Sequence, residues 1–441
     1  MTPAARIAAA IEVLGEVDAA EAPADKIVTA YLRARRYVGA KDRRAIGQRV
    51  FGLLRARARL DWWCQRAGLQ PARPRHRVLA GLLLIDREAP EAVAALFDGG
   101  RYHPPPPAPA ERTALEALSG QGLAQPEQPA WVRLECPDWL LPGFEAAFGA
   151  GAETELRALQ EEAPLDLRVN ALKGAREAAR QSLAEAGIES APTPLSPLGL
   201  RVAGRRAVTA TEAFRAGLVE VQDEGSQLLA LLTGARPGLA VCDLCAGAGG
   251  KTLALGAAMG GQGRLVAADV DPGRLAAAGP RLRRAGLSAV ELRRLAGPED
   301  PWLAVQAGGF DRVLVDAPCS GTGTWRRSPD ARWRLAPQRL DALQATQDGL
   351  LRVAAALVAP GGRLVYATCS LLPAENEARV AAFLETSPGF APLPVEAVWA
   401  EALGAAGPPE GAGRDGALRL TPGRHGTDGF YLAILERERR L

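Results

Sequence analysis

Two cysteines in this chain follow apolar, strand-like segments. Cys319 ends the segment Val-Leu-Val-Asp-Ala-Pro-Cys that begins at Val313, and Cys369 ends Leu-Val-Tyr-Ala-Thr-Cys, which begins at Leu364. Because the carboxyl ends of parallel strands meet at one edge of a sheet, we expect both thiols at the same rim. A thiolate is a strong nucleophile, although most free cysteines are small buried hydrophobic residues. Two such cysteines at one rim, each followed by serine, favour a chemical role.

A glycine-rich segment indicates where a ligand would bind beside these thiols. Residues 243–252 read Asp-Leu-Cys-Ala-Gly-Ala-Gly-Gly-Lys-Thr, between a predicted strand and a predicted helix. Glycines let a ligand approach the backbone, and a helix N-terminus offers free N–H groups. The next predicted strand ends at Asp269, where a carboxylate can accept hydrogen bonds from ribose hydroxyls. The predicted cofactor-binding residues are Cys245, Ala246, Gly247, Ala248, Gly249, Gly250, Lys251, Asp269 and Asp316.

Three kinds of ligand compete for this segment. A phosphate-binding P-loop requires Gly-x-x-x-x-Gly-Lys-Ser/Thr, and the segment differs only in having Cys245 where the first glycine belongs. The strand ending at Asp316 could then supply a magnesium ligand, as in a P-loop NTPase. A metal site at Cys242 and Cys245 has no second cysteine pair. A nucleoside cofactor without a pyrophosphate, such as S-adenosylmethionine, accounts for both the loop and Asp269, so we favour it and expect no metal.

Methylation of a pyrimidine at carbon 5 would give each thiol a task. Carbon 5 is a poor nucleophile until a thiolate adds to carbon 6 and makes the ring enamine-like. A free thiol with a pKa of about 8.5 is only about 3% thiolate at pH 7, and full activation is worth about 2 kcal/mol. A second thiol could assist release of the product, and Asp316 could hydrogen-bond the ring nitrogen as charge develops. These residues alone leave open which cysteine attacks.

The composition is that of a soluble, globular protein with more than one domain. Of the 441 residues, 48% are apolar and 23% charged, and no apolar stretch reaches the roughly 20 residues of a membrane span. The N-terminal sequence lacks the features of a secretory signal, and six cysteines do not form a disulfide framework in a chain of this length. We therefore expect a cytoplasmic protein and a monomer.

Two basic segments are candidates for contact with nucleic acid. Residues 31–60 contain ten Lys or Arg and one acidic residue, Asp42, within a net charge of only +3 for the whole chain. Residues 325–334, directly after the Cys319 motif, combine four arginines with two tryptophans. In the first interpretation, these residues are solvated or anchor the segment to the protein core. In the second, the segment binds nucleic acid, with arginines contacting phosphates and tryptophans stacking on bases.

The spacing of apolar residues divides the chain into four parts. Residues 1–103 have helical spacing, 104–130 begin with four prolines and are expected to be a linker, and 131–235 suggest a small α/β unit. The remainder, 236–441, alternates strands with helices and predicts a doubly wound, Rossmann-like α/β fold. Its strands are predicted at 239–244, 264–269, 311–316, 363–368 and 429–435, and its helices at 250–259, 272–285, 341–358 and 374–386.

In these motifs the chain resembles the RNA (cytosine-5) methyltransferases of the RsmB/Sun type. The resemblance covers residues 165–436 and rests on segments that occur in the family's order: Arg168–Lys173, Val221–Ser226, Asp243–Thr252, Asp316–Gly323, Arg327–Asp330, Tyr366–Ser370 and Asp428–Phe430. The N-terminal helices more loosely resemble the NusB-like RNA-binding domain of the RsmB branch. The resemblance therefore implies a class I methyltransferase domain, preceded by a small α/β RNA-contacting unit and an all-helical NusB-like domain.

The resemblance also implies roles for the candidate residues. Cys369 is implied to be the nucleophile and Cys319 to assist release of the product, with Asp316 and Lys251 at the target base. The implied donor is S-adenosylmethionine, and the implied substrate is RNA, with small-subunit ribosomal RNA ahead of transfer RNA. A non-catalytic RNA-binding or ribosome assembly factor is the alternative, but it would have no use for two thiols. The expected RNA contacts are Arg35, Arg36, Arg43, Arg44, Arg326, Arg327 and Arg332.

The chain departs from the family pattern at two places. Its loop reads Ala246-Gly-Ala-Gly-Gly-Lys251 where the family usually has Ala-Ala-Pro-Gly-Gly-Lys, and the loss of proline predicts a more flexible loop. Leu295 stands where the family commonly has an acid near the adenine. Glu299 and Asp300 follow shortly beyond and are the candidates to replace that acid.

Overall fold

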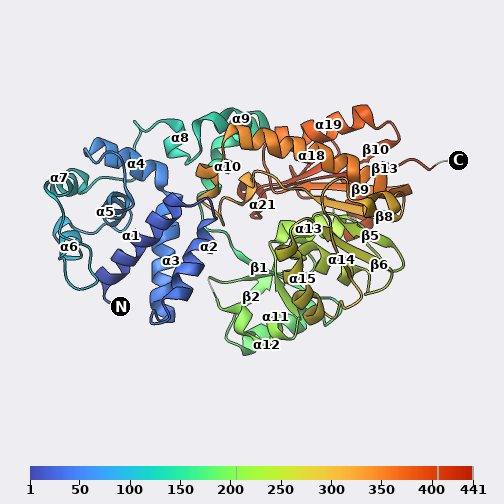
Figure 1. Cartoon of the computed structure of the whole chain (residues 1–441), viewed down its shortest axis with the longest axis horizontal. Helices are drawn as coiled ribbons and strands as arrows, with labels where there is room; N and C mark the ends of the chain where they lie inside the picture. The colour runs from blue at the N-terminus through green and yellow to red at the C-terminus, as the bar shows by residue number, and fades with distance from the viewer. Residues whose placement is uncertain (205, 405–406, 440–441) are drawn as a thin grey trace. The chain divides into compact units, whose positions relative to one another are not determined.

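The computed structural model describes residues 1–204, 206–404 and 407–439 and divides into two compact units. The first comprises residues 1–161 together with 325–335, and the second comprises 162–324 together with 336–441 (Figure 1). Within the described residues, no helix combines the length and the apolar character needed to cross a bilayer.

The first unit is helical. Its helices are α1 (Pro3–Ala19), α2 (Ala24–Ala34), α3 (Ala40–Arg55), α4 (Arg57–Arg66), α5 (Pro74–Leu84), α6 (Pro90–Ala95), α7 (Pro109–Leu118), α8 (Ala130–Arg133), α9 (Leu141–Phe148), α10 (Ala152–Ala158) and α17 (Ala331–Arg334), with 3-10 turns η1 (Asp138–Leu140) and η2 (Gly149–Gly151). The helical spacing of Val50, Leu53 and Leu54 places all three in a core that α1, α3 and α5 share. The predicted linker is wrong, because α7 adds Leu115 and Leu118 to this same core.

Residues 325–335 belong to the helical unit although they follow the Cys319 motif in sequence. Trp325 is fully buried, and its ring lies 5.5 Å from that of Phe144. Arg332 is also fully buried and donates hydrogen bonds to the carbonyl oxygens of Glu135 (2.8 Å) and Leu159 (3.1 Å). Asp330 accepts a hydrogen bond from the backbone N–H of Ala24 at 3.1 Å. The tryptophan and the charged side chains therefore anchor residues 325–335 to the helical unit.

The second unit begins with a small antiparallel sheet in the order β2-β3-β1-β4. Its elements are β1 (Leu165–Val169), α11 (Arg176–Glu185), β2 (Ser190–Pro192), β3 (Gly199–Val202), η3 (Val208–Ala210), α12 (Glu212–Arg215) and β4 (Val219–Val221). Leu167 and Val169 of β1 alternate with polar residues and pack against Leu183 of α11. A small α/β unit was predicted here, although residues 131–161 belong to the helical unit.

A nine-stranded mixed sheet forms the rest of the second unit, in the order β11-β12-β13-β9-β8-β5-β6-β7, with β10 paired to β13. Its elements are α13 (Glu224–Leu232), β5 (Ala240–Asp243), α14 (Gly250–Ala258), β6 (Arg264–Asp269), α15 (Pro272–Ala285), β7 (Glu291–Arg294), α16 (Pro301–Val305), β8 (Phe310–Asp316), η4 (Thr322–Thr324), α18 (Pro337–Leu357), β9 (Val358–Thr368), η5 (Pro373–Glu375), α19 (Glu377–Thr386), β10 (Phe390–Leu393), α20 (Val395–Leu403), β11 (Gly413–Arg414), β12 (Ala417–Leu420), α21 (Pro422–His425) and β13 (Phe430–Arg437). Strands β7, β6, β5, β8 and β9 are parallel, and β13 runs antiparallel to β9. The predicted Rossmann-like fold is therefore present.

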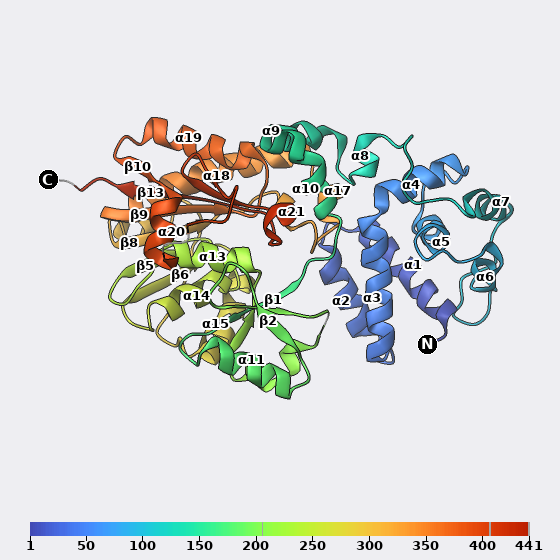
Figure 2. The same cartoon turned by 180° about the vertical axis from the view of Figure 1, so that it is seen from behind.

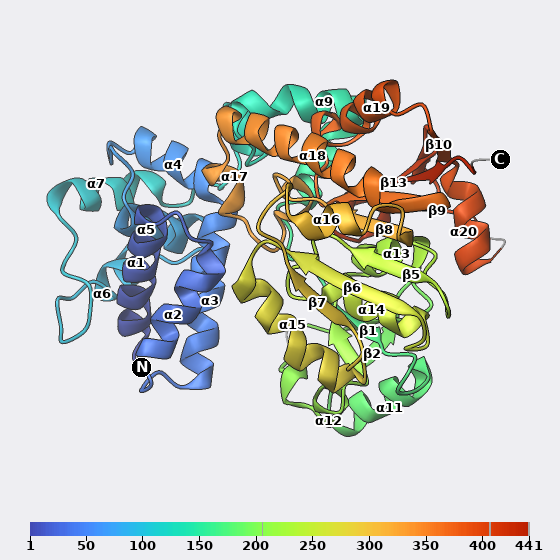
Figure 3. The same ribbon diagram turned by 45° about the vertical axis from the view of Figure 1, so that its right-hand side comes forward.

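Helices cover both faces of the large sheet, as a doubly wound fold requires. Along β8, Val313 and Val315 pack against α16, α18 and α19, whereas Leu314 points to the opposite face, toward α13, α14 and α20. Figure 3 shows α16 and α18 on the first face, and Figure 2 shows α13, α14 and α20 on the other. Because both faces are covered, the central strands are uninterrupted apolar runs, which explains why their positions were predictable.

Replacing Arg332 should destabilise the helical unit. Arg332→Ala leaves two buried carbonyl oxygens without donors, and hydrogen bonds from a charged donor contribute about 1.5–3 kcal/mol each. We expect the free energy of unfolding to fall by about 3 kcal/mol in urea denaturation monitored by circular dichroism. Arg44→Ala, at an exposed position of the same unit, is the matched control and should change stability by about 0.5 kcal/mol or less. Equal stabilities of the two variants would contradict an anchoring role.

Candidate active site

The carboxyl ends of five parallel strands surround one cavity of about 760 Å³ in the second unit. Strand β5 lies between β6 and β8, so the chain reverses its winding direction beside β5, where doubly wound folds bind ligands. The cavity is lined by Leu244, Cys245, Asp269, Val270, Asp271, Arg274, Leu295, Gly297, Pro298, Leu303, Asp316, Ala317, Pro318, Cys319, Ala345, Thr346, Gly349, Leu350, Val353 and Cys369. Both cysteines, Asp316 and Asp269 thus meet here, as predicted from the strand ends.

The glycine loop is tied to the next strand by backbone hydrogen bonds. Gly247, which has a left-handed φ of 54°, donates its N–H to Asp269 at 2.7 Å. A second N–H, from Asp271, reaches the other Asp269 oxygen at 2.8 Å, and this carboxylate retains lone pairs for two hydroxyl groups of a ligand. Arg281 holds the carbonyl oxygen of Ala248 at 2.6 Å. The left-handed φ of Gly247 favours glycine at this position, because other L residues rarely adopt it.

Two contacts are inconsistent with a P-loop. In a P-loop the threonine hydroxyl binds magnesium and the lysine reaches the phosphates. Here Thr252 is fully buried and donates its hydroxyl to Asp243 at 2.7 Å, and the Lys251 ammonium lies 2.5 Å from Asp316. In the described part of the chain, His, Cys, Asp and Glu side chains form no group of three that could hold a metal ion. The contacts of Thr252 and Lys251 therefore suit a nucleoside ligand better than a nucleoside triphosphate.

Lys251 and Asp316 form an ion pair beside the thiols. Burial would lower the pKa of Lys251, but the Asp316 carboxylate, by its charge and its hydrogen bond, raises that pKa above its ordinary value. The ammonium group also lies close enough to Cys369 that a negative charge on this sulfur favours the protonated lysine. A cation in this position stabilises a thiolate. Lys251, which the sequence analysis placed at the target base, is thus paired with another predicted site residue.

The two cysteine loops are locked together by their backbones. Gly323 donates its N–H to the carbonyl oxygen of Cys369 at 2.9 Å, and Gly429 donates to the carbonyl oxygen of Gly323 at 2.8 Å. A Cβ on either glycine would collide with the backbone of the other. The sulfur atoms of Cys319 and Cys369 consequently lie 3.4 Å apart, within hydrogen-bonding distance for sulfur. This contact explains why the Asp428–Phe430 motif accompanies the two cysteine motifs.

The two thiols differ in electrostatic environment. The hydrogen bond to Cys369 and burial raise the pKa of Cys319 well above its ordinary value. Cys319 therefore stays protonated at neutral pH and can donate its S–H to Cys369. The charged neighbours of the two sulfur atoms also differ, because the Lys251 ammonium lies near Cys369 and the Glu375 carboxylate lies near Cys319. The geometry thus distinguishes two thiols that the residues alone left equivalent.

Sequence reasoning missed Glu375, which braces the Cys319 loop. We expected it in the first turn of a helix, but α19 begins at Glu377 and the Glu375 side chain turns inward, fully buried. Its carboxylate accepts hydrogen bonds from the backbone N–H (2.8 Å) and the hydroxyl of Ser320, and from Nε2 of Gln347 (3.0 Å). The Ser320 hydroxyl also lies 3.2 Å from that of Ser370. The serine that follows each cysteine was the feature of the sequence that could have indicated a hydrogen-bonding partner such as Glu375.

The wall of the cavity near β7 is apolar. Leu295, Gly297 and Pro298 line it where the family commonly has an acid. Asp300 is occupied elsewhere, because it caps α16 by accepting hydrogen bonds from the N–H groups of Ala296 and Trp302. Asp300 therefore does not take the place of the missing acid.

The predicted RNA-contacting arginines separate into structural and exposed residues. Arg332 is buried in the helical unit and Arg326 is 5% exposed, so the expectation that these two side chains reach RNA is wrong. Arg43 donates hydrogen bonds to the carbonyl oxygens of Val38 and Arg35 at the end of α2. Arg35 lies over the Tyr31 ring and pairs with Glu12. The exposed members of the predicted set are Arg36, Arg44 and Arg327.

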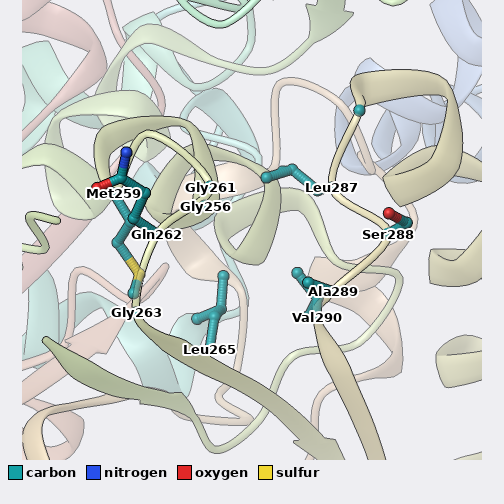
Figure 4. Close-up of a pocket in the computed structure, with 11 residues that line it drawn as sticks. Gly256, Met259, Gly261, Gln262, Gly263, Leu265, Leu287, Ser288, Ala289 and Val290 are labelled. Atoms are coloured by element: carbon teal, nitrogen blue, oxygen red, sulfur yellow. The ribbon is translucent and has the colours of Figure 1, made fainter. Parts of the chain in front are cut away.

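A smaller cavity of about 160 Å³ lies at the opposite, amino-terminal ends of β6 and β7. Figure 4 shows its lining, which includes Met259, Gln262, Leu287 and Val290. Since none of its lining residues is titratable, it offers no groups for acid–base or nucleophilic chemistry.

Comparisons with known proteins agree on one family. A model described as 16S rRNA methyltransferase RsmB/F matches residues 230–436, and one for the ferredoxin-like domain of RsmF/B-like methyltransferases matches 136–209. A probable ribosomal RNA small subunit methyltransferase B of Synechocystis is 36% identical over 303 residues, covering 68% of this chain and 66% of the relative. Ribosomal RNA small subunit methyltransferase B of Yersinia pseudotuberculosis is 32% identical over 366 residues, covering 79% and 83%. The crystal structure of PH0851 superimposes with a TM-score of 0.79 at 25% identity, covering 99% of both chains.

Asp243 should make the folded protein less stable as the pH rises. Burial raises the pKa of its carboxyl from 3.8 to about 6. Between these values the folded protein keeps a proton that the unfolded chain releases, so the free energy of unfolding falls with rising pH, by up to about 3 kcal/mol. Asp243→Asn, which keeps an acceptor for Thr252, should therefore stabilise the protein at about pH 8 and have little effect at about pH 4. Urea titrations at the two pH values test this, and an equal effect at both would contradict it.

Glu375→Gln should loosen the Cys319 loop. The amide oxygen can still accept from the Ser320 N–H and from Gln347, but the amide NH2 then faces the Ser320 hydroxyl, which loses its acceptor at a cost of about 1–3 kcal/mol. We expect a lower free energy of unfolding and faster alkylation of Cys319 by iodoacetamide in the native protein, followed by mass spectrometry. The control is Glu385→Gln, at an exposed position of α19. Alkylation of Cys319 at the control rate would show that Glu375 does not brace this loop.

Proposed function

The chain belongs to the RsmB/F family of S-adenosylmethionine-dependent RNA methyltransferases, and we propose that it methylates carbon 5 of a cytosine in ribosomal RNA. Support for the finer statement comes from the pair of sulfur atoms 3.4 Å apart at the cavity that also contains Asp269 and Asp316. Methyl transfer to an oxygen or an exocyclic nitrogen needs no thiol, whereas transfer to carbon 5 can use two.

The cavity fits S-adenosylmethionine by its hydrogen-bond acceptors and its apolar wall. The Asp269 carboxylate can accept hydrogen bonds from the ribose hydroxyls, and the apolar wall with Leu295 and Pro298 suits an adenine ring. The cofactor supplies an electrophilic methyl group on a positively charged sulfur. Asp316, at the end of β8, lines the same cavity as Asp269 and the thiols, and the family resemblance implies a role for it at the target base.

The proposed reaction begins with a bond between the Cys369 sulfur and carbon 6 of the cytosine. Lys251 stabilises the thiolate before attack. Asp316, once it has taken up a proton, hydrogen-bonds or protonates the ring nitrogen as the electron density there rises, and recovers this proton when the product forms. Carbon 5 then forms a bond to the methyl group while the bond from that group to the donor's sulfur would break, which would leave the donor as a neutral thioether. The ring becomes aromatic again when carbon 5 loses its proton to a base and the bond from carbon 6 to sulfur breaks, which returns the Cys369 thiolate. We propose that Cys319 assists this last step.

The substrate RNA must present an accessible base and contact the protein outside the cavity. A cytosine that is unpaired or flipped out avoids most of the few kcal/mol needed to break stacking. We propose that exposed arginines contact phosphates, namely Arg36, Arg44 and Arg327. The helical unit is proposed to be a NusB-like RNA-binding domain, and small-subunit RNA is the proposed target because the relatives carry that name.

Cysteine variants test the proposed chemistry. Cys369→Ala should abolish both methylation and covalent attachment to RNA, because it removes the thiol proposed to attack carbon 6. Cys319→Ala should lower turnover by about 10²–10⁴-fold and accumulate a protein–RNA complex that survives denaturing electrophoresis. Radiolabelled cofactor, ribosomal RNA transcripts and nucleoside mass spectrometry provide the readouts. Cys64→Ala, at a buried position of the helical unit, is the control and should react like the parent.

Two outcomes would contradict the proposal. A covalent complex formed by Cys369→Ala but not by Cys319→Ala would exchange the roles of the two cysteines. A methylated nucleoside other than 5-methylcytidine would show that the protein methylates another atom, and both thiols would then need a different explanation.

A further inference from the structure

The helical unit contains a groove of about 560 Å³ that the proposed function does not yet use. It lies between α1, the end of α2 with the turn that follows, and a turn at residues 100–103. Its lining residues are Met1, Thr2, Ala5, Ala8, Ala9, Glu12, Tyr31, Arg35, Tyr37, Val38, Arg101, Tyr102 and His103. A volume in the range of about 300–1,000 Å³ is typical of ligand sites.

Two tyrosine rings border this groove and face solvent. Tyr37 is 77% exposed and Tyr102 is 73% exposed, whereas the other three tyrosines of the chain, Tyr31, Tyr366 and Tyr431, are buried. Exposed aromatic rings lose the hydrophobic stabilisation that burial would provide, so a pair of them at one groove suggests a binding surface. Tyr37, and the face of Tyr102 that Arg101 does not cover, are available for stacking.

The backbone at Tyr102 adopts a conformation that disfavours a tyrosine. Tyr102 has a φ of 68°, in the left-handed region, within a turn closed by a hydrogen bond from the His103 N–H to the Gly100 carbonyl oxygen. Glycine or asparagine is the usual residue at such a position. His103 holds the turn in place, with Nδ1 2.7 Å from Asp98 and Nε2 2.9 Å from the hydroxyl of Thr2. The fold thus tolerates local strain to present an aromatic ring.

Basic residues are close to both tyrosines, either in the sequence or in space. Arg36 and Lys41, close to Tyr37 in the sequence, are exposed, and the Arg101 guanidinium lies 5.0 Å from the centroid of the Tyr102 ring. The acidic residue of the groove, Glu12, is already engaged by the Tyr31 hydroxyl and Arg35. The groove therefore offers aromatic faces and cations, which are the groups that bind bases and phosphates of single strands.

We propose that this groove binds an unpaired segment of RNA, with bases stacked on Tyr37 and Tyr102. Arg36, Lys41 and Arg101 contact the phosphates. An RNA duplex does not fit this chemistry, because its base faces are covered by their neighbours. The statement that this RNA is the methylated substrate rests on the proposed function. The statement that the groove stacks RNA bases does not.

Binding of a short, fluorescein-labelled oligouridine to the full chain tests the site by fluorescence anisotropy. Tyr37→Ala and Tyr102→Ala should each weaken binding by about 5- to 150-fold, as expected for loss of one stacked base. Tyr37→Phe and Tyr102→Phe should bind like the parent, because they keep the ring. The control is Trp139→Ala, at another exposed aromatic position of the same unit, which should leave the affinity unchanged.

A glycine at position 102 separates binding from stability. Tyr102→Gly relieves the left-handed strain and should raise the melting temperature, while it weakens oligouridine binding as much as Tyr102→Ala does. A higher melting temperature together with weaker oligouridine binding would indicate that Tyr102 contributes to binding at a cost in stability. A stabilised variant with parental affinity would overturn the proposal.

The same experiments distinguish this inference from the proposed function. If the parent methylates RNA but both alanine variants bind oligouridine like the parent, the groove does not bind RNA and the inference fails alone. If the tyrosines are required for oligouridine binding but no RNA is methylated, the proposed function fails and the stacking site stands. Parental RNA binding by the alanine variants, together with loss of binding to an acidic peptide, would assign the groove to a protein partner and overturn the inference.

Discussion

The site depends on one close approach of backbone to backbone, between Gly323 and Gly429. No side chain fits between them, and each N–H finds a carbonyl oxygen in the neighbouring segment, so the Cys319 loop, the end of β9 and the start of β13 form one layer. This layer brings Cys319 and Cys369 within hydrogen-bonding distance although 49 residues lie between them in the sequence. The chemistry proposed for the two thiols requires this distance, and the glycines make it sterically possible.

The charged side chains around this layer have ion-pair or hydrogen-bond partners within the protein. Lys251 is paired with Asp316, and the buried Glu375 accepts three hydrogen bonds from donors around the Cys319 loop. Each contact offsets the cost of burying a charge and at the same time orients a loop that carries a thiol. Arg332 follows the same principle in the helical unit, where it joins backbone segments instead of binding a ligand.

The comparison between sequence and structure separates local from long-range information. Strand β6 has the predicted bounds, because an apolar run covered on both faces is visible without knowledge of its neighbours. The short strands β7, β10, β11 and β12 were missed, since two to four residues carry too little periodicity and pair only after the sheet exists. The predicted linker failed for a related reason: its prolines obscured α7, whose apolar residues are buried only against α5 and the rest of the helical core.

By itself the sequence determined the doubly wound fold of the second unit, the glycine loop with Asp269, and the two thiols at one rim. These features follow from local patterns, because a strand end or a tight glycine turn is encoded by adjacent residues. Only the tertiary structure decided which charged groups lie beside each thiol, that Glu375 faces inward, and that Arg332 is structural. Those properties depend on burial and on partners far away in the chain, and free energies of charged and polar groups are set by such surroundings rather than by residue type.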